Sequence, residues 1–237
     1  MGGVRGFCMD DGLIALFAAV TAFVGSHLLL SHALRRRMVD ALSVTGFQLV
    51  YSMLSFILLL LVLAAYHQAP HLPILWASDN AVMQFVYALG SCCAAALFVA
   101  SLYRNPGLVG AKITDLSTRP PAGVYLVTRH PMMFSLIVWS LLQIMITPSL
   151  RNLIVFGGFT VLALAGSRLQ DRKKVAQTGR EWAMWVSRTP FWPKLSRLGA
   201  LGPAWLIGLI LAALITAVQT RTTLTQVGLW YFLPPVF

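Results

Sequence analysis

The side chains that could do chemistry in this 237-residue chain are few, and the most prominent is a histidine inside an apolar run. His27 lies about eight residues before Arg35, which places it about 12 Å inside the end of that run at 1.5 Å per residue. Ionisable groups inside a bilayer are costly and are taken as functional by default. A neutral imidazole there can ligate a metal or a haem iron, or it can hydrogen-bond a neighbouring helix. His27 is therefore a candidate metal and cofactor ligand.

A second candidate site lies in the run Thr128-Arg129-His130-Pro131. Proline is well tolerated in the first turn of a helix, so a helix is predicted to begin at Pro131. Arg129 and His130 would then lie at a helix N-terminus, which is suited to holding an anion. In the alternative interpretation, Arg129 reaches lipid phosphate and His130 only caps the helix. Both residues are candidates for cofactor binding.

Gln143 is the one strongly polar side chain deep in the following apolar run. It shares a helix face with Ser135 and Trp139 because the three are spaced by four residues. Polar side chains inside helix bundles usually bond a neighbouring helix, and this is the role predicted for Gln143. Ligation of a cofactor by its amide is the alternative.

These residues must be positioned by helices that cross a membrane. Hydrophobic residues make up 58% of the chain and charged residues 11%, which is outside the range of soluble globular proteins. A bilayer core of about 30 Å needs about 20 apolar residues as helix. The chain has six runs that meet or approach that length: 13–34, 46–66, 81–103, 132–147, 151–169 and 203–220. The sequence predicts an all-α membrane protein with a single domain, a bundle of about six transmembrane helices over residues 1–237.

The positive charges lie almost entirely in alternate loops. Of the 18 lysine and arginine residues, only Arg5, Arg151 and Arg221 lie outside the loops that follow the first, third and fifth runs. Cytoplasmic loops carry such an excess, so both termini are predicted to be non-cytoplasmic. The net charge of +11 is then explained by sidedness, and no nucleic acid partner is expected. The expected location is a lipid bilayer, the bacterial inner (plasma) membrane.

The segment between the fifth and sixth runs has an amphipathic pattern. From Gln170 to Ser187, one predicted helix face carries apolar side chains that include Trp182 and Trp185, and the other carries lysines and an arginine. This pattern predicts a cytoplasmic amphipathic helix at the membrane surface, with its tryptophans at headgroup level.

Residues from about 20 to 195 resemble the NnrU-like membrane proteins, a family that includes the haem-dependent zeta-carotene isomerase. The matching pieces, in order, are Gly25-Ser26-His27, Leu34-Arg35, Gly46-Phe47 through Tyr51-Ser52, Thr128-Arg129-His130-Pro131-Met132, Trp139, Phe156-Gly157-Gly158, Asp171-Arg172, Gly179-Arg180-Glu181-Trp182 and Arg188-Thr189-Pro190-Phe191-Trp192-Pro193. For the isomerase members, the resemblance implies a haem b held by two histidines. The first ligand matches His27, and Gln143 occupies the place of the second.

Two alternatives come from different classes of protein. The Arg-His-Pro start of a helix, with a later Gly-x-x-Trp, is similar to the isoprenylcysteine and phospholipid methyltransferases. This similarity implies S-adenosylmethionine binding near Arg129 and His130, with Gln170 and Asp171 in the places of two adjacent glutamates. The other alternative is a non-catalytic accessory or assembly subunit, whose aromatic segment 229–233 docks a membrane protein partner or anchors at the interface.

Overall fold

The computed structural model describes residues 10–70, 74–103, 105–106, 120–223 and 226–233. Among these residues the regular structure is helical, apart from an isolated bridge between Ile74 and Ser149, and this confirms the all-α prediction. The helices divide between two compact units, each described separately here. The first holds residues 1–77 and 147–162, and the second holds residues 78–146 and 163–237. The single domain proposed over residues 1–237 stays a prediction.

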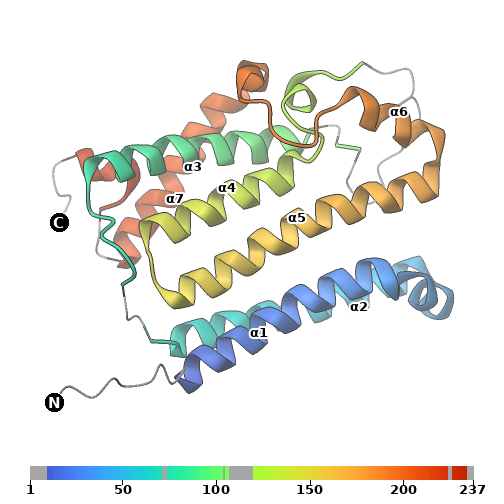
Figure 1. Cartoon of the computed structure of the whole chain (residues 1–237), viewed down its shortest axis with the longest axis horizontal. Helices are drawn as coiled ribbons and strands as arrows, with labels where there is room; N and C mark the ends of the chain where they lie inside the picture. The colour runs from blue at the N-terminus through green and yellow to red at the C-terminus, as the bar shows by residue number, and fades with distance from the viewer. Residues whose placement is uncertain (1–9, 71–73, 104, 107–119, 224–225, 234–237) are drawn as a thin grey trace, which may run out of the picture. The chain divides into compact units, whose positions relative to one another are not determined.

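The first unit is built on α1 (Asp11–Leu28), α2 (Arg35–Gln68) and the first part of α5 (Leu150–Thr178). Helix α1 begins where the Asp10 side chain accepts a hydrogen bond from the N–H of Gly12 at 2.8 Å. Its buried residues fall at intervals of three and four, which is the spacing of one helix face: Leu13, Leu16, Val20 and Phe23. This face packs against Val62 of α2 and Val155 of α5, so that α1 and α2 lie side by side (Figure 1).

The turn between the first two spans is helical rather than a loop. A π-helical turn, η1 (Leu29–Ala33), follows α1, and α2 begins at once with Arg35. The 34 residues of α2 are two helices joined at Ser43, whose φ of 67° is non-helical. The Ser43 hydroxyl accepts the N–H of Gly46 at 3.3 Å and so caps the second helix. The arginines after α1 therefore lie on a short helix, and the predicted span begins just after Ser43.

The second unit is centred on α3 (Ala81–Ser101), α4 (Pro131–Ile146) and α7 (Ala204–Thr223). Helix α4 begins at Pro131 as predicted. Small residues let these helices approach closely (Figure 1). Gly90 of α3 packs against the Leu142 side chain of α4, and Gly208 of α7 lies against the backbone of Ala96. The Ser135 hydroxyl donates to the Ala94 carbonyl at 2.7 Å and ties α4 to α3.

The described residues include five helices long and apolar enough to cross a membrane, and α4 is a shorter apolar helix of 16 residues. The protein is therefore an integral membrane protein. Helix α5 extends about two turns past the predicted span and ends at Gly179, whose φ is +55°. A separate helix, α6 (Arg180–Arg188), follows it. The amphipathic segment predicted as one helix from Gln170 is thus divided at this glycine.

The close contact at Gly208 allows a test of the α3–α7 packing. A Cβ there would lie 2.6 Å from the amide nitrogen and 2.7 Å from the Cα of Ala96. Because backbone atoms cannot move aside cheaply, Gly208→Ala is expected to cost about 1–3 kcal/mol of stability. Thermal unfolding in detergent micelles measures this cost.

The matched control is Gly166→Ala, because a Cβ at Gly166 meets no atom within 4 Å. That variant is expected to be as stable as the wild type or to gain up to about 1 kcal/mol, since alanine favours the helix. A Gly208→Ala protein that unfolds at or above the wild-type temperature would contradict the helix contact.

Candidate functional site

The start of α4 is held by a segment about sixty residues later in the chain. The N–H of Arg129 donates to the Pro190 carbonyl at 2.9 Å. The Thr128 hydroxyl donates to the Phe191 carbonyl at 2.7 Å, and the N–H of Lys194 donates to the Val127 carbonyl at 2.9 Å. The Thr-Arg-His-Pro and Arg-Thr-Pro-Phe-Trp-Pro sequences therefore lie side by side. Their hydrogen bonds fix the backbone position of Arg129 and His130.

Asp171, near the end of α5, is the centre of this corner. Its Oδ2 accepts from Arg129, with Nε at 2.9 Å and Nη2 at 2.8 Å. Its Oδ1 accepts from the indole N–H of Trp182 at 3.2 Å and lies 3.0 Å from Nε2 of His130. The remaining Arg129 nitrogen, Nη1, donates to the Thr189 carbonyl at 3.0 Å. One carboxylate of α5 thus joins side chains from the segment just before α4 and from α6.

The charges of this corner largely cancel. The side chains of Arg129 and Asp171 are only 10% and 15% exposed, so the pair lies mostly out of solvent. Such a pair is favourable only when its hydrogen bonds are satisfied, and here each guanidinium nitrogen has an acceptor. Phe191 adds a cation–π contact, with its ring 5.1 Å from the Arg129 guanidinium carbon. Arg129 therefore carries little uncompensated positive charge for an external anion.

His130 is buried, and its two ring nitrogens have different surroundings. Nε2 faces the Asp171 carboxylate at 3.0 Å, although its N–H is not aligned well enough for a hydrogen bond, so the contact is electrostatic. A carboxylate beside Nε2 favours the tautomer that carries the proton there. Nδ1 makes no hydrogen bond with the part of the chain that the structure describes. In a neutral ring its lone pair is available as an acceptor or a ligand.

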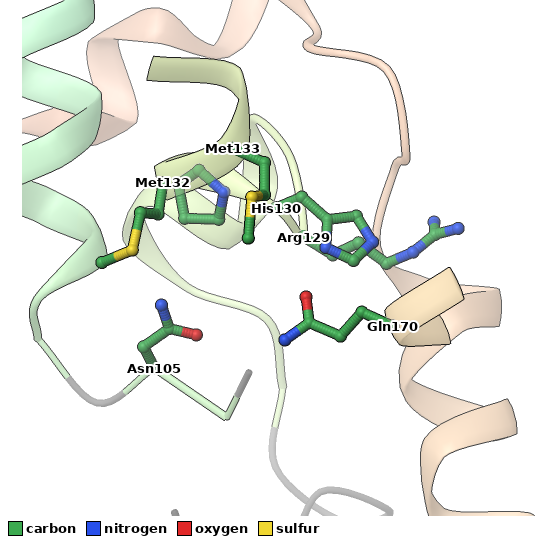
Figure 2. Close-up of a pocket in the computed structure, with 7 residues that line it drawn as sticks. Asn105, Arg129, His130, Met132, Met133 and Gln170 are labelled. Carbon is green, nitrogen blue, oxygen red and sulfur yellow. The ribbon is translucent and has the colours of Figure 1, made fainter. Parts of the chain in front are cut away.

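His130 lines a small pocket of about 60 Å³ (Figure 2). The side chains of Met132 and Met133 lie along one side, and the amides of Asn105 and Gln170 lie across from them. By the measure in which one water needs about 10–15 Å³, the pocket holds a few water molecules. It is small for an organic cofactor, whose pockets commonly reach about 300–1,000 Å³.

His27 lies in the first unit, on the last turn of α1. Its Nδ1 is 2.9 Å from the Phe23 carbonyl, and this oxygen can only accept, so Nδ1 carries the proton. The Phe23 ring lies 4.3 Å from the imidazole centroid and the Tyr51 ring lies 5.4 Å from it. The imidazole is half-buried between these rings, and Nε2 keeps its lone pair.

Gln143 lies in the second unit within a network that joins three helices. Its side-chain oxygen accepts from Gln219 of α7 at 3.2 Å, and Gln219 accepts from the hydroxyl of Tyr87 on α3 at 2.6 Å. Gln143 therefore bonds another helix, as the sequence predicted. A role for its amide in cofactor binding stays a prediction.

The tryptophans of α6 differ from their predicted position at the lipid headgroups. Trp182 and Trp185 are 1% and 2% exposed and lie in the core of the second unit. Tyr125 packs against Trp185 with ring centroids 5.5 Å apart. The apolar face of α6 is covered by the protein itself, because residues of α3 and of the loop before α4 fill the space that lipid was expected to occupy.

A family model described as "NnrU protein" matches residues 15–225. The chain belongs to the NnrU family. No curated protein and no solved structure gives a significant match.

The NnrU match spans every candidate residue named from the sequence: His27, Arg129, His130 and Gln143. The structure brings Arg129 and His130 together on Asp171, whereas Gln143 lies elsewhere in the same unit and His27 lies in the other. The methyltransferase resemblance had placed Gln170 and Asp171 near Arg129 and His130, but sequence reasoning missed the pairing role of Asp171 and the pocket residues Asn105 and Met133. The available signal was an acidic residue, Asp171, within the otherwise basic end of α5.

Proposed function

We propose that this NnrU-family protein binds haem through His27 and acts on a hydrophobic substrate within the membrane. The observation that carries the proposal is the bond between His27 Nδ1 and the Phe23 carbonyl, which in a neutral ring leaves the lone pair on Nε2. A histidine that ligates a metal almost always donates its other ring N–H to a carbonyl or a carboxylate. His27 has this arrangement, and its Nε2 makes no hydrogen bond with any residue that the structure describes.

The surroundings of His27 also fit a large flat ring. Phe23 and Tyr51 supply aromatic contacts on either side of the imidazole. The helix itself is an apolar segment, Asp11–Ala33, so a bound group would be reached from the lipid. Haem iron would supply a redox-active or Lewis-acidic centre there.

The fit holds for one histidine ligand and not for two. Gln143, which stands in the place of the family's second histidine, has its side-chain oxygen bonded to Gln219. Within the described ranges, no group of three or more histidine, cysteine or acidic residues could hold a metal ion. We therefore propose that His27 alone supplies the imidazole, and that this chain departs from the bis-histidine pattern of the isomerases.

The two alternatives have less support. Arg129, expected to hold the carboxylate of S-adenosylmethionine, is bonded to Asp171 and to Thr189, and the adjacent pocket is small for that cofactor. The aromatic segment expected to dock a partner is tied to its own unit, because the indole N–H of Trp230 donates to the Ala213 carbonyl at 3.1 Å. Three apolar side chains of that segment remain exposed, Leu229, Phe232 and Leu233, so the accessory-subunit alternative keeps more support than the methyltransferase one.

The test is the absorption spectrum of the full-length protein purified in detergent from cells supplied with haem precursor. The wild type is expected to show a Soret band and about one haem per chain. His27→Ala is expected to lose at least about 90% of that band, because a haem with no axial ligand is held only by apolar contacts. His67→Ala is the matched control, since His67 is an exposed histidine of the same unit.

A second variant separates ligation from misfolding. His27→Gly in buffer with imidazole is expected to regain the Soret band, because free imidazole can enter the vacated space and bind the iron. A colourless wild-type protein, or a band of equal strength in wild type and His27→Ala, would overturn the proposal. A colourless protein would favour the accessory-subunit alternative.

A further inference from the structure

The pocket beside His130 has donor atoms that the haem proposal does not use. We propose that His130, together with the thioethers of Met132 and Met133, forms a binding site for a soft monovalent metal ion, copper(I). This inference goes beyond the haem at His27 and does not depend on it. It rests on the orientation of His130, on the donor types around the pocket and on the pocket's size and charge.

The orientation of His130 leaves one ring nitrogen able to bind a metal ion. The ring is 4% exposed, so its orientation is fixed by packing, and Phe191 lies against it with ring centroids 5.4 Å apart. The Asp171 carboxylate beside Nε2 places the proton of a neutral ring on that nitrogen. A carboxylate behind a histidine is the usual outer partner of a metal-ligating imidazole. Nδ1 is left as the ligating atom.

Two methionine thioethers line the pocket together with the His130 ring. Met132 and Met133 are consecutive residues of the first turn of α4, directly after His130 and Pro131, and both line the pocket. Figure 2 shows the thioether of Met133 beside the His130 ring and that of Met132 farther along the same wall. Thioether and imidazole ligands select copper(I). The residues lining the pocket include no carboxylate and no thiol, so magnesium and calcium lack a charged ligand and zinc finds a single imidazole.

The charge and the size of the pocket restrict the kind of ion that it can hold. Arg129 lines the pocket and its charge is cancelled by Asp171, so the surroundings of the pocket carry little net charge, which suits a monovalent ion better than a divalent one. A pocket of about 60 Å³ accommodates one ion with its ligands and excludes larger groups. Asn105 and Gln170 place amides on the opposite side. We assign His130 Nδ1 and the Met133 sulfur as the principal ligands, completed by Met132.

The experiment uses the full-length protein in detergent micelles with carbon-13 in the methionine methyl groups, of which there are nine. Silver(I) serves as a redox-inert probe, and the titration is repeated with copper(I) kept reduced by ascorbate. The three cysteine thiols bind the first equivalents, so the titration continues past their saturation. The expected result is a shift of the Met132 and Met133 methyl signals, each assigned by its Leu variant.

Three variants make the result specific. His130→Gln keeps a donor for Asp171 but has no ligating ring nitrogen, and it is expected to weaken binding at Met133 by at least about tenfold. Met133→Leu conserves core volume, so it folds, and it is expected to abolish tight binding while His130 is intact. Met184 of α6 lies outside the pocket, so Met184→Leu is the control and is expected to leave the titration unchanged.

Two results would overturn the proposal. One is methyl signals of Met132 and Met133 that stay unmoved after the thiols are saturated. The other is an equal shift of the Met133 signal in wild type and His130→Gln, which would show that the thioethers bind the ion without the imidazole. Loss of haem in His27→Ala is expected to leave this titration unchanged. The haem proposal and the copper(I) proposal can therefore fail independently of each other.

Discussion

Asp171→Ala is expected to lower the free energy of unfolding by about 3–5 kcal/mol, because it leaves the buried charge of Arg129 without a partner. The carboxylate accepts from Arg129 through two nitrogens at 2.9 and 2.8 Å and from the Trp182 indole at 3.2 Å. Without Asp171, Arg129 keeps its bond to the Thr189 carbonyl, which carries no negative charge. The effect is measured as the shift of the thermal or denaturant unfolding curve in detergent micelles, followed by tryptophan fluorescence.

Glu181→Ala is the matched control for this charge removal. Glu181 is half-buried in the first turn of α6 and forms no ion pair with any described residue, so its loss is expected to change stability by about 0.5 kcal/mol or less. The double variant Arg129→Ala/Asp171→Ala is expected to lose less free energy of unfolding than the sum of the losses in the two single variants. The expected difference is about 0.5–3 kcal/mol. Equal effects of the Asp171 and Glu181 changes would show that Arg129 reaches solvent instead.

Trp182→Ala and Trp185→Ala are each expected to cost about 3–5 kcal/mol of stability, since both indoles are buried in the core of the second unit. A tryptophan at lipid headgroups would cost far less to remove. Trp192→Ala, which removes an indole that is 58% exposed, is the control and is expected to cost about 1 kcal/mol or less. The measurement is again the unfolding transition in micelles.

Phenylalanine at the same two positions separates volume from hydrogen bonding. Trp182→Phe loses the bond to Asp171, whereas Trp185→Phe removes an N–H that has no partner in the structure. Trp182→Phe is therefore expected to be the less stable of the two, by about 1–3 kcal/mol. The reverse order would contradict the position of Asp171 beside the Trp182 indole.

The sequence predicted the helices well because the bilayer imposes a length and a composition on each span. Pro131 and the apolar residues after it predicted where α4 begins, and the structure agrees. Gln143 was predicted to bond a neighbouring helix, and it bonds Gln219. The candidate residues Arg129 and His130 were found from their place before Pro131, although their partner Asp171 was not.

The features that the sequence did not reveal depend on contacts between distant segments. Whether the apolar face of α6 meets lipid or protein is decided by residues of α3 and of the loop before α4, which no periodicity within α6 can report. The serine at position 43 does not by itself predict the break in α2, because serine is tolerated inside helices as well as at their starts. The Met132 and Met133 side chains look like ordinary core residues until the loop geometry places them beside His130.

The bonds between the start of α4 and residues 190–194 have a consequence for biosynthesis. Thr128 and its partner Phe191 are 63 residues apart, and Arg129 precedes Asp171 by 42. At about 5–20 residues per second, the ribosome takes roughly 3 to 13 s to deliver Phe191 after Thr128. For that interval α4 enters the membrane with its first turn untied, and water or lipid headgroups must solvate the Arg129 guanidinium. The corner around His130 is therefore completed only after translation of the chain through α6.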